Sequence, residues 1–228
     1  DTVAPFSIAW NSIGIGTYIL TAKAHDNSGG TSTSPAVTVQ VNANAAPTVG
    51  LTAPANNSAY TAPATINLAA NAADRDGTIA RVDFYNGATR IGTASTAPYR
   101  FTWNNVAGGA YSLTAKATDD KGAITTSTAV AVKVNKVPTV ALSAPANNAV
   151  LVAPTNVTIS ATAGDTDGSV AKVEFLRDGV LLGSDVSAPY SFSWVNVPVG
   201  TYVLTARATD NLGAKTLSSA PRAIVVPP

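Results

Sequence analysis

Six aspartates are the side chains in this sequence best placed to do chemistry. Asp74 and Asp76 belong to the motif DRDG, and the motif DTDG places two more aspartates 91 residues later. Asp119 also has a counterpart 91 residues further on. Calcium takes six to eight oxygen ligands, which carboxylates, amide oxygens and backbone carbonyls can supply. One hypothesis is therefore an interdomain calcium site built from Asp74, Asp76, Asp119, Asp165, Asp167 and Asp210.

An ordinary turn is the competing hypothesis for both motifs. Asp side chains accept hydrogen bonds from nearby backbone N–H groups, and glycine accepts the positive φ that many turns need. Asn42, Asn44 and Asn135 lie in or beside the expected linkers and could approach the same carboxylates, whereas Lys121 and Lys136 count against a cation there. Both hypotheses stay open, and calcium is the only cofactor considered.

Other candidates for catalysis are few. Cysteine is absent, and His25 is the single histidine. Thr118 and Thr209 take its place in the other repeats, so a function common to the repeats cannot depend on it. The sequence has no nucleophile elbow, zinc-protease motif or phosphate-binding loop. Pairs of carboxylates can hydrolyse glycosides, but these recur at the same loop position in each repeat. We expect a structural role for them and no enzyme activity.

The composition argues against nucleic-acid and membrane partners. Charged residues make up 12% of the 228 residues, with 14 Lys and Arg against 13 Asp and Glu, so the chain has no strong field to attract polyanions. It also has no run of about 18 apolar residues that could span a bilayer. Hydrophobic residues make up 46%, which is enough for a folded core.

A repeat of 91 residues organises the chain. Trp103 and Trp194 are 91 residues apart, as are Tyr111 and Tyr202, whereas Trp10 precedes Trp103 by 93. The segment NANAAP at 42–47 absorbs the difference and reads as a linker. We predict complete domains at 46–136 and 137–228. Residues 1–43 match only the C-terminal half of a repeat.

Within each repeat, apolar side chains alternate with polar ones. In YSLTAKA at 111–117, every second residue is apolar or small, which is typical of a strand with one buried face. The dipeptides NG at 86–87 and DG at 178–179 indicate hairpin turns between such runs. About seven short strands in each repeat predict an all-β fold of tandem antiparallel β-sandwiches.

Four motifs together resemble bacterial immunoglobulin-like (Ig-like) repeats of secreted polysaccharide hydrolases and large surface proteins. They are PTV at the start, DxDG after the second strand, APY or APF before the tryptophan, and YxLTAxAxD before the last strand. The resemblance implies Ig-like sandwiches and an extracellular or bacterial cell-surface location. The cysteine pair of antibody domains is absent, but Tyr111 and Tyr202 resemble their tyrosine corner.

The aromatic residues offer little to a carbohydrate. Thirteen of the fifteen fall on the predicted core face, and only Tyr60 and Tyr85 remain, at positions where the next repeat has Leu151 and Leu176. Carbohydrate binding is therefore weakly supported. The expected partners are neighbouring Ig-like domains of the same or an identical chain.

Residues 1–43 should supply only the last three strands of a sandwich. Phe6, Ile8, Trp10, Tyr18 and Leu20 would then face water. With no methionine at position 1, the chain is expected to be a processed or excised piece. Two explanations stay open: an interior segment of a longer repeat protein, or a sandwich that a neighbouring subunit completes by adding strands.

The sequence as a whole predicts a non-catalytic extracellular spacer or fibre segment. Such a segment could assemble into a surface filament or an adhesin stalk. The alternative function is an accessory module of a secreted polysaccharide-degrading enzyme, with weak carbohydrate contact.

Overall fold

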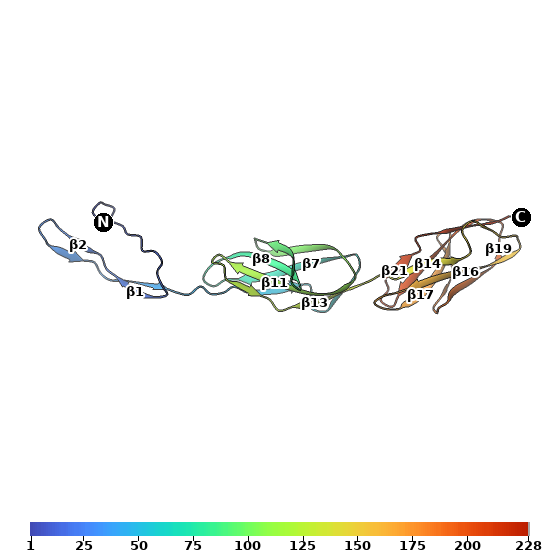
Figure 1. Ribbon diagram of the computed structural model, residues 1–228, viewed down its shortest axis with the longest axis horizontal. Coiled ribbons are helices and arrows are strands. Elements are labelled where there is room, and N and C mark those ends of the chain that lie inside the picture. Colours follow the sequence, from blue (N-terminus) through green and yellow to red (C-terminus); the bar gives the residue numbers. More distant parts are fainter. Residues whose placement is uncertain (228) are drawn as a thin grey trace.

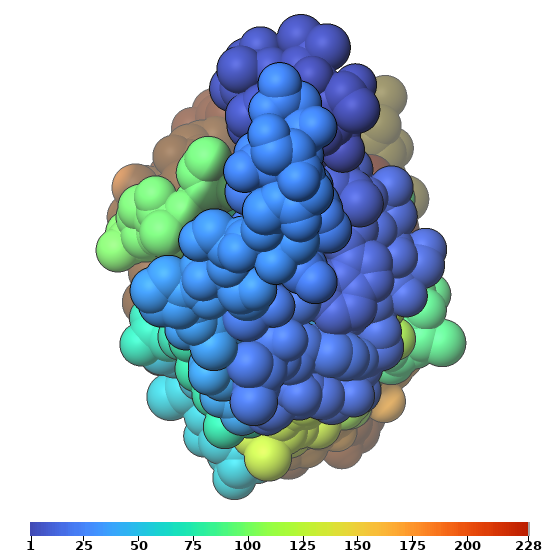
Figure 2. All heavy atoms as spheres, turned by 90° about the vertical axis from the view of Figure 1, so that its left-hand side faces the viewer, coloured from blue at the N-terminus to red at the C-terminus, as the bar shows by residue number. Residues whose placement is uncertain are grey.

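The computed structural model describes residues 1–227, which form three all-β parts in a row (Figure 1). Seen from its N-terminal end, the row is nearly straight, because the first part hides much of the other two (Figure 2). The described residues contain no helix, and hence no helical membrane span. The predicted all-β class is confirmed.

The middle part of the row is a two-sheet sandwich. One sheet has the strand order β10, β7, β5, and the other has the order β6, β13, β11, β8, β9, with β12 paired to β11. The strands are β5 (Thr48–Ala53), β6 (Ser58–Thr61), β7 (Ala64–Ala73), β8 (Ile79–Asn86), β9 (Thr89–Ala94), β10 (Tyr99–Val106), β11 (Gly109–Asp119), β12 (Ile124–Thr126) and β13 (Val130–Asn135). The first strand is split between the two sheets as β5 and β6. For this reason β6 runs parallel to β13, an exception to the predicted antiparallel pairing.

The next part of the row has the same topology. One sheet has the order β14, β16, β19, and the other has the order β15, β22, β20, β17, β18, with β21 beside β20. The strands are β14 (Thr139–Ala144), β15 (Ala149–Val150), β16 (Thr155–Gly164), β17 (Val170–Arg177), β18 (Val180–Asp185), β19 (Tyr190–Val197), β20 (Gly200–Asp210), β21 (Lys215–Leu217) and β22 (Arg222–Val226). The exact boundaries at 46–136 and 137–228 stay a prediction. Below we call these two sandwiches the second and third repeats.

Alternating side chains close each core between the two sheets. Phe84 in the second repeat and Phe175 in the third are fully buried, each among aliphatic residues from both sheets. Trp194 packs edge-on against Tyr202, with ring centroids 5.0 Å apart, and the Tyr202 hydroxyl donates to the Pro198 carbonyl at 3.0 Å. Tyr111 makes the equivalent bond at 2.7 Å. The tyrosine-corner resemblance therefore has a structural counterpart in both repeats.

Residues 1–43 form two ribbons of paired strands instead of a sandwich. Strands β1 (Gly16–Leu20) and β4 (Val37–Val41) pair, as do β2 (Lys23–His25) and β3 (Thr31–Thr33). The expected strand through residues 6–10 does not form. The equivalent strands β10 and β19 take their backbone hydrogen bonds from β7 and β16, and residues 1–43 contain no equivalent of those two strands.

The apolar face of residues 1–43 is consequently open to solvent. Ile8 is 92% exposed and Trp10 is 45% exposed, whereas Trp194 is only 9% exposed. Trp10 still packs edge-on against Tyr18, with ring centroids 4.9 Å apart. Local contacts thus hold the tryptophan–tyrosine pair without the second sheet. The two explanations for this half repeat both stay predictions.

We predict that Trp194→Ala destabilises the third repeat by about 3–5 kcal/mol, because it leaves a cavity between the sheets. Trp10→Ala should change the unfolding free energy of either complete repeat by less than about 0.5 kcal/mol, since it lies outside both cores. Calorimetric unfolding of the full chain measures both effects. Equal losses from the two variants would contradict the burial difference.

Candidate functional site

The acidic motifs lie in the loop between β7 and β8, and in the equivalent loop between β16 and β17, at the end where the chain enters each repeat. In the second repeat the Thr78 N–H donates to Asp120 Oδ1 at 3.1 Å, and the Asp120 N–H returns a bond to the Thr78 carbonyl at 2.9 Å. Ser169 and Asn211 make the same two bonds in the third repeat, at 3.0 and 2.9 Å. These bonds tie the loop after the second strand to the turn that follows Asp119 or Asp210, as the sequence pattern predicted.

One side-chain hydrogen bond joins the second repeat directly to the third. Asn135 Nδ2 donates to Asp210 Oδ2 at 2.7 Å, and both residues are buried, at 4% and 2% exposed. Asn135 is also the last residue of β13, where its carbonyl accepts a bond from the Ala62 N–H at 2.9 Å. A single residue therefore completes a sheet of one repeat and binds a carboxylate of the next.

A second contact at this junction uses the backbone of the linker. The Lys136 N–H donates to both carboxylate oxygens of Asp167, each at 3.3 Å. The Lys136 side chain lies against Gly108 of the second repeat, where any Cβ would collide with it. Lys136 is thus held between the two repeats.

The first junction repeats this arrangement 91 residues earlier. Asn44 Nδ2 donates to Asp119 Oδ2 at 2.8 Å, and the Ala45 N–H donates to the two oxygens of Asp76 at 3.1 and 3.2 Å. Lys121 Nζ also donates to the Asp76 carbonyl at 3.0 Å. We call each set of an asparagine side chain, the following backbone N–H and two aspartates a junction clamp. The clamps consist of Asn44, Ala45, Asp76 and Asp119, and of Asn135, Lys136, Asp167 and Asp210.

Three of the clamp carboxylates have a pKa below the ordinary value of aspartate. Burial acts to raise the pKa of Asp210, but hydrogen bonds from Asn135 and from the N–H groups of its own turn outweigh it and leave the pKa below its ordinary value. The pKa of Asp119 is lowered against burial in the same way, by Asn44 and its own turn. The Ala45 N–H is the main cause of the lowered pKa of Asp76. The hydrogen bonds to these three carboxylates are thus intact above the unfolded Asp pKa of about 3.9, and weaken only as the pH falls through the lower folded values.

The six predicted site residues divide into two groups. Asp76, Asp119, Asp167 and Asp210 accept bonds from the linkers, as described above. Asp74 and Asp165 accept bonds from the N–H groups two residues later, at 3.4 and 3.3 Å, which is the ordinary-turn geometry. Asp74 Oδ2 and Asp165 Oδ2 are buried without a hydrogen-bond partner.

Sequence reasoning found some of the clamp partners and missed others. It placed Asn44 and Asn135 near the carboxylates, and the structure brings them into contact. Asn42, which was expected there too, is exposed to solvent. The linker N–H groups and Gly108 were missed, because backbone donors leave no mark in a sequence.

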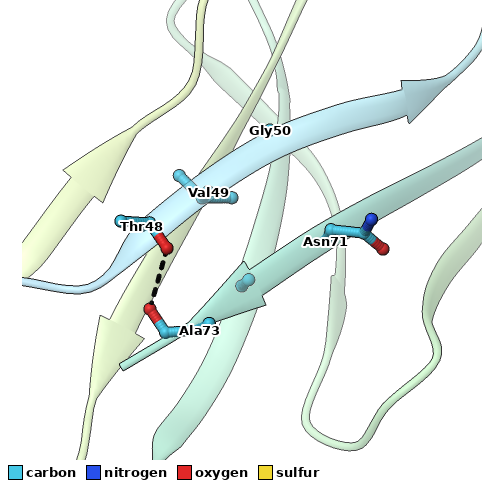
Figure 3. Close-up of a pocket in the computed structure, with 6 residues that line it drawn as sticks. Thr48, Val49, Gly50, Asn71 and Ala73 are labelled. Carbon is cyan, nitrogen blue, oxygen red and sulfur yellow. Dashed lines mark hydrogen bonds between the residues drawn. The ribbon is translucent and has the colours of Figure 1, made fainter. Parts of the chain in front are cut away.

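Shallow hollows on the outer sheet faces add nothing to this site. The larger one lies between β5 and β7, where the Thr48 hydroxyl donates to the Ala73 carbonyl at 3.1 Å (Figure 3). A similar hollow lies between β14 and β16. Neither is lined by a titratable side chain.

We predict that Asn135→Ala loosens the second junction, because it removes the donor to the buried Asp210 carboxylate. Spin labels introduced with Thr128→Cys and Ser187→Cys, in a chain with no native cysteine, should show a broader distance distribution. The matched control is Thr166→Ala, a change at an exposed residue next to Asp167 in the loop between β16 and β17. It should leave the distance distribution unchanged. An equally narrow distribution in the Asn135 variant would show that the clamp does not set the junction.

Calcium at the junctions stays a prediction. In the part of the chain that the structure describes, no group of three or more His, Cys, Asp or Glu side chains is arranged to hold a metal ion. If calcium binds, millimolar calcium should raise the melting temperature of the apo chain and narrow the label distances, and Asp165→Asn should abolish both effects. If calcium changes neither quantity, the metal hypothesis is wrong and the hydrogen-bonded clamp accounts for these carboxylates.

This chain is similar to several known proteins. Exoglucanase B from Cellulomonas fimi is 34% identical over 215 residues, which cover 89% of this chain and 19% of the exoglucanase. Among solved structures, the fibronectin(III)-like modules of Clostridium thermocellum CbhA are 34% identical, with a TM-score of 0.39, over 78% of this chain and 93% of that one. Three N-terminal domains of the bacteriophage RB49 Highly Immunogenic Outer Capsid protein are 10% identical, with a TM-score of 0.42, over 92% and 88% of the two chains.

A family model gives the most direct assignment. The model described as a bacterial Ig domain matches residues 47–115 and 138–206, one match in each complete repeat and more than half of the chain together. The chain therefore belongs to the bacterial Ig domain family.

Proposed function

We propose that this chain is a non-catalytic spacer that holds other parts of a secreted or cell-surface bacterial protein at a fixed separation. The observation that carries the proposal is the junction clamp, which recurs with the same four positions at both junctions. Three of the buried polar side chains, Asp119, Asn135 and Asp210, make contacts that orient one repeat against the next. None of the clamp groups is paired with a nucleophile or a catalytic base.

The geometry suggests how such a spacer resists bending. Only residues 136–138 lie between β13 and β14. Because Asn135 is fixed in the sheet of one repeat and bonded to Asp210 of the next, rotation about the linker has to break a hydrogen bond to a charged group, which is stronger than a neutral one. Each added repeat would then extend the row without adding a free hinge.

A second candidate function is an accessory module of a polysaccharide-degrading enzyme. The relative named Exoglucanase B favours it, although this chain spans only 19% of that protein. The aromatic side chains of the two complete repeats argue against a strong sugar-binding face there. Tyr60 and Tyr85 are half-buried, and the Lys116 ammonium lies 4.5 Å from the centre of the Tyr85 ring. Contact with a polysaccharide would therefore be weak and polar.

The two functions can be separated by mixing the full chain with microcrystalline cellulose and measuring how much protein is removed from solution. The spacer function predicts no saturable retention. Saturable retention with a dissociation constant in the micromolar range would overturn it in favour of the accessory module, since that affinity corresponds to about 8 kcal/mol of specific contact. A Tyr85→Ala variant would then show whether the half-buried tyrosine takes part.

A further inference from the structure

An apolar band crosses the outer face of the larger sheet of the third repeat. We define the apolar band as Val150, Leu176, Leu181, Val203 and Val225, with one residue from each strand of the row β15, β22, β20, β17, β18. Val150 is 66% exposed, Leu181 52%, Val203 42% and Val225 36%. Leu176 is 6% exposed and does not belong to the core between the sheets, so the other four residues supply the exposed surface of the band.

Strand register makes the band continuous. Leu181 pairs with Leu176, and Val150 pairs with Val225. Val203 lies diagonally between these two pairs, because Leu176 pairs with Thr205 and Val225 pairs with Thr201. Diagonal neighbours on one sheet face are about 7–8 Å apart, within reach of each other's side chains.

The second repeat carries no such band on the same face. The residues at the equivalent positions are Ala59, Tyr85, Arg90, Ser112 and Lys133. Arg90 and Lys133 are cations, and the other three are an alanine, a serine and a tyrosine. The two repeats share a topology and a core pattern, so the difference concerns the surface of the third repeat alone.

We propose that the apolar band is a self-association site, through which two copies of the chain pack their third repeats face to face about a two-fold axis. The band contains no charge that would select a charged partner, and no aromatic ring on which a sugar could stack. An aliphatic face of this kind fits another aliphatic face, and a second copy supplies one with identical shape. The net charge of +1 gives little repulsion between copies.

The size of the face suits a weak dimer. Five strands about 4.8 Å apart, with a mean length of about six residues, make a face of about 24 by 20 Å. Packing two such faces buries about 1,000 Å² in total, which is the size of a weak or transient interface. The dimer should therefore form at micromolar or higher concentrations.

Charged residues lie beside the apolar band in the third repeat and take the place of two of its residues in the second repeat. Next to the band, Arg207 Nε lies 2.8 Å from Glu174 Oε2, and Lys172 Nζ lies 3.1 Å from Glu174 Oε1. These contacts, that of Arg207 above all, lower the pKa of Glu174 to about 2, so two cations share one carboxylate at the rim. In the second repeat, the same packing would bury Lys133 against its own copy, together with Arg90, which lies 3.6 Å from Asp83. Taking these cations out of water has a desolvation cost that the aliphatic band of the third repeat does not have.

Sedimentation velocity of the full chain tests the proposal. The protein concentration should run from about 10 to 500 µM, because an interface of this small size is expected to be weak. The wild type should show a concentration-dependent shift from monomer to dimer. The triple variant Leu181→Arg, Val203→Ser and Val225→Lys places the second repeat's residues in the band, and should weaken dimerisation at least tenfold. Calorimetry of the same variant checks that the third repeat stays folded.

The matched control is Val195→Asn, which makes the same kind of exchange on the opposite sheet, where valine is 56% exposed. It should dimerise like the wild type. A wild type that stays monomeric throughout, or a control that dissociates as much as the triple variant, would overturn the proposal. A reciprocal variant carries Arg90→Leu, Ser112→Val and Lys133→Val, which place the band's residues in the second repeat. If this variant also dimerises through its second repeat, the proposal gains further support.

Discussion

A carboxylate buried at the entrance of each repeat constrains the whole arrangement. Asp210 is 2% exposed, and a buried charge is costly unless donors surround it. Two donors are the N–H groups of its own turn, at Leu212 and Ala214, and the third is Asn135 of the preceding repeat. The entrance of one repeat is therefore satisfied only when the previous repeat is correctly oriented.

This constraint links the packing of each core to the shape of the row. The core fixes β20, which places Asp210 at the end of that strand, just as β13 fixes Asn135 at its own end. Two rigid sheets thus present their terminal residues to each other over a linker of three residues. The orientation of one sheet relative to the next is set by the hydrogen bond from Asn135 to Asp210 and by the linker N–H that donates to Asp167.

The two complete repeats have the same residues at several core positions and differ on the outer face of the larger sheet. Leu113 and Leu204 are both fully buried, and Val82 and Val173 occupy the same inner position. On the outer face, polar residues of the second repeat are replaced by aliphatic residues in the third. The inner positions are limited by packing density, whereas the outer positions are free to specify a partner.

The sequence by itself determined the all-β class, the 91-residue period and the inward-facing side chains. These follow from local spacing, since alternation along a strand fixes which face a residue occupies. It also predicted that the acidic motifs would meet the turns that follow Asp119 and Asp210. Residues 6–10 were expected to form a strand and do not, because strand formation there needs hydrogen bonds from a neighbouring strand.

Only the tertiary structure decided what the carboxylates bind and how the third repeat differs outside. Asn135 and Asp210 are 75 residues apart, and their contact depends on where two separate sheets end. The apolar band requires the register of five strands, which places residues from 150 to 225 side by side. Contacts between distant segments are set by the packing of whole sheets, so no local pattern in the sequence could define them.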